Sequence, residues 1–136
     1  MTTPIDSNLL IRHFTGDPPE QARRATDFIR KAPPGELLLL DVHVAECVYV
    51  LEGPYRQSPA EVARLFAAVL AVPSIAVEHE LAIRRALELY AGHGFDFPDA
   101  YLVATAEVNG FPHVAGFDRF DAKLRKASTV RRVEPR

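Results

Sequence analysis

The stretch LLLLDVHVAECVYVLEGP, residues 37–54, joins an uninterrupted apolar run to a longer apolar segment. The four consecutive leucines at 37–40 predict a strand that is buried on both faces. Residues 42–51 predict a mostly buried helix, which Gly53 and Pro54 end. A strand followed directly by a helix is the repeating unit of a parallel sheet.

The same alternation extends along the chain on both sides of this unit. Further strands are expected at residues 2–6, 73–77, 112–115 and 129–133, the last of them at an edge. Further helices are expected at residues 8–14, from the prolines at 18–19 to residue 32, from 59 onward, and at 79–91, 98–108 and 118–126. Short strands that alternate with helices indicate βαβ crossovers. We therefore expect a single α/β domain over residues 1–136, with a mostly parallel central sheet flanked by helices on both faces.

Composition limits the class of protein. A chain of 136 residues with 48% hydrophobic and 25% charged residues fits one globular domain. The single cysteine, Cys47, excludes an internal disulfide and a multi-cysteine metal cluster within one chain. The longest apolar stretch, residues 37–51, is too short and too charged to span a bilayer, and residues 1–10 do not resemble a signal peptide. We therefore expect a cytoplasmic protein with no membrane partner.

Charge is unevenly distributed along the chain. The net charge is −2, but residues 119–136 carry seven basic side chains against Asp121 and Glu134. A basic segment on an acidic body is typical of a protein that holds a polyanion near a carboxylate site. A solvated charged face is the alternative interpretation.

Four acids are expected where the carboxyl ends of parallel strands bring ligands together. They are Asp6 at the end of the first strand, Glu46 in the helix after the second, Asp99 after the glycine-containing loop 92–94, and Asp118 beyond the fourth strand. The aspartates also have a local explanation as helix caps: Asp6 with Ser7, Asp99 in a capping box with Asp96, and Asp118 before the helix that follows it.

Glu46 is harder to explain locally, because its helical neighbours are mainly apolar. Burying an isolated carboxylate is costly, so such a group needs a partner, a proton or a metal ion. His43 is a possible partner one helical turn away. Otherwise Glu46 points into a site.

Four converging carboxylates would repel one another unless a cation lay between them. Ligation by oxygen alone suits a hard ion such as Mg²⁺ or Mn²⁺, which activates water and neutralises charge on a phosphodiester. Other chemistries lack support: the five histidines show no zinc-protease spacing, and no glycine-rich nucleotide-binding loop is present. Cys47, in an apolar helix, is expected to be a packed thiol.

The same residues resemble the PIN domain, and more closely the VapC-type toxins of toxin–antitoxin pairs. The four stretches that carry the resemblance are IDSNLLIRHFTGDPPEQ (5–21), VAECVYVL (44–51), FDFPDAYLVATAEVNG (95–110) and GFDRFDAKL (116–124). They occur in the family's order and cover nearly the whole chain.

The resemblance implies that Asp6, Glu46, Asp99 and Asp118 bind the metal and act in catalysis. Asp99 matches the third acid because it directly precedes the stretch AYLVA at 100–104, and Asp96 is an auxiliary acid. Asn8 matches a supporting position, and Ser7 replaces a more common threonine. The sequence departs from the family at Gly116, where many relatives carry threonine or serine two residues before the last acid.

By this resemblance the protein is expected to be an endoribonuclease dependent on Mg²⁺ (or Mn²⁺) that leaves 5′-phosphate and 3′-hydroxyl ends. Its partners would be an RNA substrate, a cognate VapB-type antitoxin and a second copy in a homodimer. Arg12 and the C-terminal arginines would hold RNA phosphates. The alternatives are a catalytically weak or inactive PIN fold that binds RNA or protein, and a phosphorelay receiver domain with Asp41 as acceptor.

Overall fold

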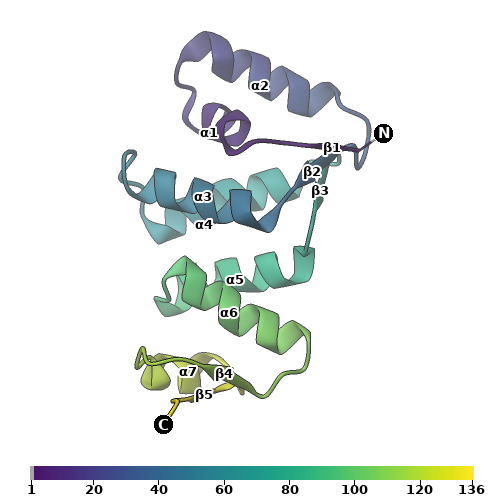
Figure 1. Ribbon diagram of the computed structural model, residues 1–136. Coiled ribbons are helices and arrows are strands. Elements are labelled where there is room, and N and C mark those ends of the chain that lie inside the picture. Colours follow the sequence, from purple (N-terminus) through teal and green to yellow (C-terminus); the bar gives the residue numbers. More distant parts are fainter. Residues whose placement is uncertain (1) are drawn as a thin grey trace. The chain divides into compact units, whose positions relative to one another are not determined.

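The computed structural model describes residues 2–136, which form seven helices and five short strands (Figure 1). Contacts divide the chain into two compact units, the first ending at Glu80 and the second comprising Leu81–Arg136. None of the helices among these residues is long and apolar enough to cross a membrane.

The first unit contains a three-stranded parallel sheet in the order β1-β2-β3. Its strands are β1 (Thr3–Pro4), β2 (Leu37–Leu39) and β3 (Ile75–Val77). The first crossover contains α1 (Ser7–Thr15) and α2 (Pro19–Lys31), and the second contains α3 (Asp41–Glu52) and α4 (Pro59–Leu70). Helix α1 packs against both α2 and α3 (Figure 1).

Local sequence signals set the ends of these helices. Asp6 caps α1, and Gly16 ends it in the left-handed conformation at φ 70°. The Ser58 hydroxyl accepts a hydrogen bond of 3.2 Å from the Glu61 N–H at the start of α4, as the sequence predicts. In β2, Leu37 and Leu39 are fully buried and Leu38 is half-buried.

Helix α3 is less buried than the sequence predicts. Its buried side chains, Val44, Cys47, Val48 and Leu51, recur at intervals of three and one and make a single stripe. Val42 and Tyr49 lie outside that stripe and are exposed. An apolar residue buries its side chain only where a neighbouring element covers its face of the helix.

The second unit contains all of α5 (Glu80–His93) after its first residue, together with α6 (Phe97–Val108), β4 (His113–Ala115), α7 (Asp121–Ala127) and β5 (Arg131–Val133). Strands β4 and β5 pair in parallel and form a two-stranded sheet. Ile83, Leu89, Val103 and Leu124 are almost fully buried in its core. All strand pairings of the described residues are thus parallel, and the predicted α/β class is confirmed.

Candidate metal centre

Asp6 follows β1 and forms the N-cap of α1. Its Oδ1 accepts a hydrogen bond of 2.9 Å from the Ser7 N–H, so the capping explanation is correct for Asp6. Ser7 is the first helical residue and not the cap. The Asp6 side chain remains exposed, so the capping role leaves its carboxylate open to a further ligand.

Ser7 connects α1 to Glu46 on α3. The almost fully buried Ser7 hydroxyl donates a short hydrogen bond to Glu46 Oε1. His43 Nδ1 lies 2.7 Å from the same hydroxyl and 3.5 Å from Glu46 Oε1. Because the single Ser7 proton is directed at the carboxylate, His43 Nδ1 donates to Ser7 Oγ.

The structure corrects the expected environment of Glu46. Its side chain is 57% exposed and is therefore no buried carboxylate. Glu46 lies outside the buried stripe of α3, but its Oε1 accepts a hydrogen bond from the Ser7 hydroxyl. The hydrogen bond from Ser7, helped by His43, outweighs partial desolvation and lowers the pKa of Glu46. Glu46 is consequently ionised and fixed in orientation.

These groups form a cluster of potential metal ligands. Ligand atoms of Asp6, His43 and Glu46 all lie within 4.8 Å of one another. The two carboxylates predicted from the sequence in this unit, Asp6 and Glu46, are therefore brought together.

In the second unit, the remaining predicted acids, Asp99 and Asp118, interact electrostatically. Burial raises the pKa of Asp99, and the charges of Asp96 and Asp118 raise it further, against the opposing charge of Lys123. Asp96 occupies the N-cap position of α6 but its side chain makes no capping hydrogen bond. The capping-box explanation for Asp96 and Asp99 is therefore wrong.

Asp118 lies in the loop between β4 and α7. The helix predicted at 118–126 begins at Asp121, with Phe120 at its N-cap. Asp118 is thus no helix cap, and its carboxylate is exposed. Its charge raises the pKa of Asp99.

The donor chemistry of the two groups fits a hard divalent cation. Oxygen ligands from carboxylates are the ones that Mg²⁺ and Mn²⁺ prefer. Burial, and then the charges of Asp96 and Asp118, disfavour the ionised form of Asp99, and a bound cation would favour it.

Cys47 is a packed thiol, as predicted. It is fully buried, and its Sγ lies 3.8 Å from the Ser7 carbonyl oxygen. Desolvation, together with the charges of Glu46 and Asp6, raises the pKa of Cys47 to about 12. The thiol is therefore protonated and unreactive at neutral pH.

A second cluster joins the ends of β2 and β3. His79 Nδ1 lies 2.6 Å from Asp41 Oδ2, and Glu78 Oε1 accepts from the Asp41 N–H at 3.1 Å. Ligand atoms of these three residues also lie within 4.8 Å of one another. Since Glu78 caps the first turn of α3, the cluster has a structural role in joining β3 to α3.

The C-terminal arginines are less free than the charge pattern predicts. Arg132 lies 3.1 Å from Asp121 Oδ2 and 3.1 Å from Glu134 Oε1. Arg132 also donates to the Gly116 carbonyl oxygen at 2.7 Å. Arg132 therefore fastens β5 to the segment around Asp118 and is not available for RNA phosphates.

The PIN domain family model matches residues 5–127, which include all four predicted acids. The chain belongs to the PIN domain family. PIN domains have a nuclease-type fold and are usually metal-dependent nucleases. Membership also makes the phosphorelay receiver interpretation wrong. No curated protein matches the chain.

Two features of the PIN domain site were not predicted from the sequence. The sequence indicates Ser7 only as a cap and as a replacement for threonine, whereas its hydroxyl donates a hydrogen bond to Glu46, 39 residues away. The charge of Lys123 opposes the rise in the pKa of Asp99, and its Nζ donates a hydrogen bond of 2.9 Å to the Gly94 carbonyl oxygen. Neither contact has a local spacing signal, because each joins separate elements.

Proposed function

We propose that the protein is a metal-dependent endoribonuclease that hydrolyses RNA phosphodiester bonds. The observation that carries this proposal is the family match over residues 5–127, which retains Asp6, Glu46, Asp99 and Asp118. The clustering of Asp6 with Glu46, and the charge interaction of Asp99 with Asp118, support it.

In this proposal Asp6, Asp99 and Asp118 are the principal ligands of Mg²⁺ or Mn²⁺. Such a cation supplies a water of lowered pKa and neutralises charge on the phosphodiester. Glu46 orients the attacking water or binds the cation through a water molecule. Ser7 keeps Glu46 in one position and in its ionised form, so Ser7 is a positioning residue.

We further propose that the nuclease is the toxin of a VapBC-type pair and acts in the cytoplasm. The support is the resemblance of its four motifs, in order, to VapC-type toxins. A VapB-type antitoxin that covers the acidic site would silence the enzyme, and a homodimer would be its working form. Co-purification with the product of an adjacent reading frame tests this part of the proposal.

The nuclease proposal is tested by incubating labelled total transfer RNA and a structured RNA with Mn²⁺, Mg²⁺ or EDTA. The Asp99→Asn protein, prepared identically, controls for contaminating nucleases. We expect cleavage that requires the cation and is lost in the variant. Equal cleavage by both proteins would show that the activity does not belong to this site.

One observation favours a second candidate, a PIN fold that binds RNA or protein without cutting. Gly116 lacks the hydroxyl that many relatives carry two residues before the last acid. A binding protein of this kind would show neither cleavage nor a rise in melting temperature on addition of Mg²⁺ or Mn²⁺. A rise without cleavage would instead indicate an intact metal site and an untested substrate.

A further inference from the structure

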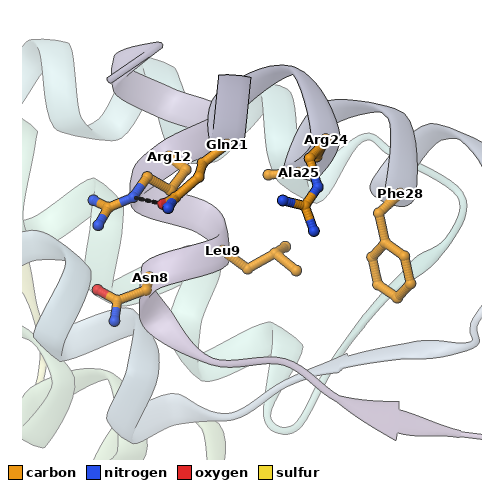
Figure 2. A pocket seen from close by; sticks show the side chains of 7 residues that line it. All are labelled: Asn8, Leu9, Arg12, Gln21, Arg24, Ala25 and Phe28. Carbon is orange, nitrogen blue, oxygen red and sulfur yellow. Dashed lines mark hydrogen bonds between the residues drawn. The ribbon is translucent and has the colours of Figure 1, made fainter. Parts of the chain in front are cut away.

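Helices α1 and α2 enclose a groove of about 520 Å³ in the first unit. Leu9 and Arg12 line it from α1, and Gln21, Arg24 and Phe28 line it from α2 (Figure 2). The only charged side chains in its lining are the two arginines. The groove is therefore a positively charged feature on a chain whose net charge is −2.

The two guanidinium groups have capacity for a ligand. Arg12 Nε donates to Gln21 Oε1 at 2.9 Å, which fixes its position across the two helices (Figure 2). Its remaining N–H groups are not taken up by this bond. Within residues 2–136, the Arg24 guanidinium forms no hydrogen bond or ion pair, and its side chain is exposed. Paired N–H donors of this kind bind phosphate oxygens.

The groove also offers an aromatic face. Phe28 is 48% exposed, although the groove floor beside it includes the buried Ala25. In Figure 2 the Phe28 ring and the side chains of Arg24 and Leu9 lie around the same space between the helices. An exposed ring next to a free guanidinium provides a stacking surface and a phosphate contact within one groove.

The groove begins beside the candidate metal centre. Asn8, which also lines it, is only two residues from Asp6, and Arg12 lies one turn further along α1. The axis of α1 covers roughly 9 Å between Asp6 and Arg12 at 1.5 Å per residue. A polymer bound at the carboxylates can therefore continue into the groove.

We propose that the α1–α2 groove binds unpaired nucleotides of the RNA next to the bond that is cut, with Arg12 and Arg24 on phosphates and Phe28 stacked on a base. This inference rests on the proposed nuclease function and specifies its substrate as single-stranded at this position. A base inside a duplex is already stacked on its neighbours and has no free face for Phe28. An acidic peptide is the competing occupant, but the groove's continuity with a phosphodiester site favours RNA.

Binding is measured in the Asp6→Asn background, so that RNA is not cut during the experiment. Asparagine is also a good N-cap, so α1 keeps its start. The probe is a fluorescein-labelled oligouridylate of about 12 nucleotides, and the competitor is a blunt RNA hairpin without unpaired ends. Fluorescence anisotropy gives the Kd over a range of salt concentrations.

Arg24→Ala is expected to weaken binding about fivefold and to reduce the slope of log Kd against log salt by about 0.7. Arg23→Ala is the matched control, because Arg23 is an exposed arginine on the same helix outside the groove. It should change neither quantity. An Arg24→Ala protein indistinguishable from Arg23→Ala in both would overturn the proposal.

Two substitutions at Phe28 separate the contribution of its aromatic ring from that of its hydrophobicity. Phe28→Leu is expected to weaken binding about tenfold, whereas Phe28→Tyr, which keeps a stacking face, should bind like the parent. In the otherwise wild-type enzyme, Phe28→Leu should raise KM and leave kcat unchanged. Equal competition by the blunt hairpin, or equal loss in both Phe28 variants, would contradict stacking on an unpaired base.

The remaining outcomes separate this inference from the nuclease proposal. If cleavage depends on the metal but RNA binding does not depend on Arg24 and Phe28, the groove proposal is wrong and the nuclease proposal is supported. RNA binding that needs both residues, in a protein that cuts no RNA, supports the groove and overturns the nuclease. If both substitutions instead weaken binding only of a labelled glutamate-rich peptide, the groove is a protein-binding site and the inference is wrong.

Discussion

At the candidate metal centre, the Ser7 hydroxyl sets the orientation of the Glu46 carboxylate through a hydrogen bond. Ser7→Ala removes the hydrogen bond to Glu46 and frees His43 Nδ1 from its acceptor. We expect kcat to fall about tenfold, because Glu46 loses its fixed orientation. Ser7→Thr keeps a hydroxyl and should retain most activity. If Ser7→Ala and Ser7→Thr are equally active, the hydroxyl does not position Glu46.

Gly116 lies two residues before Asp118, and the structure leaves space for a side chain there. Apart from Gly116 itself and its two chain neighbours, no heavy atom of the described residues lies within 4 Å of a Cβ added at this position. Gly116→Ser is therefore expected to fold normally and to raise kcat by supplying the missing hydroxyl two residues before Asp118. Gly116→Ala has the same effect on the backbone without a hydroxyl and is the matched control. Equal rates for the two variants would show that the hydroxyl is not needed.

At the scale of elements, an ion pair joins α5 to α6 and to the end of α7. Arg85 Nε donates to Glu107 Oε1 at 2.7 Å, and an Arg85 Nη2 donor reaches the Ala127 carbonyl oxygen at 2.7 Å. Ser128 Oγ donates to the second Glu107 oxygen at 2.5 Å. The side chains of Arg85 and Glu107 are only 26% and 23% exposed, so solvent screens this pair weakly.

Glu107→Ala should lower the free energy of unfolding by about 2 kcal/mol, because it leaves a partly buried arginine without its partner. Glu88→Ala is the matched control: Glu88 also pairs with Arg85, at 3.1 Å, but is 67% exposed. Its removal should cost at most about 0.5 kcal/mol. Urea unfolding of the three proteins checks both values, and equal losses would contradict a special role for Glu107.

The stabilising contact between His79, which follows β3, and Asp41 at the start of α3 depends on pH. The hydrogen bond and the charge of Asp41 raise the pKa of His79 above its ordinary value of 6.5. The stabilisation is therefore fully present below about pH 6.5 and is lost as the pH rises through the folded-state pKa. His79→Gln should lower the urea midpoint more at about pH 5.5 than at about pH 8. The same substitution at His113, which pairs with no carboxylate among residues 2–136, should show no such difference.

Binding of the proposed divalent cation should also change the stability of the protein. At a concentration about 100 times its Kd, Mn²⁺ should raise the free energy of unfolding by about 2.7 kcal/mol, and EDTA should reverse the effect. Asp6→Asn and Asp99→Asn, which each remove a proposed ligand, should each reduce this effect. Thermal unfolding with and without the cation measures this directly.

A control distinguishes lost metal binding from damaged folding. In EDTA, the Asp99→Asn protein should be at least as stable as the wild type, because Asp99 is destabilised by burial and by its neighbours Asp96 and Asp118. A variant that unfolds at a lower temperature in EDTA would show that Asp99 supports the fold. A cation effect that is undiminished in Asp6→Asn would show that Asp6 is not a ligand.

The alternation of strands and helices, the parallel α/β class and the order of the four acidic motifs could all be predicted from the amino-acid sequence. Leu37–Leu39 formed the predicted strand and Ser58 the predicted cap because such signals depend on residues a few positions apart. The family match over residues 5–127 spans all four motifs and includes each of the four acids. These features need no knowledge of which elements pack together.

Tertiary structure decided the surroundings of the acids. Apolar neighbours in sequence predicted that Glu46 is buried, yet it is exposed and held by Ser7. Arg132 was assigned to RNA by its charge but binds Asp121 and Glu134. The groove between α1 and α2 likewise exists only once the two helices pack. The physical reason is common to all three: the partner of a side chain depends on which faces the crossovers bring together, and helical periodicity within one segment does not determine that.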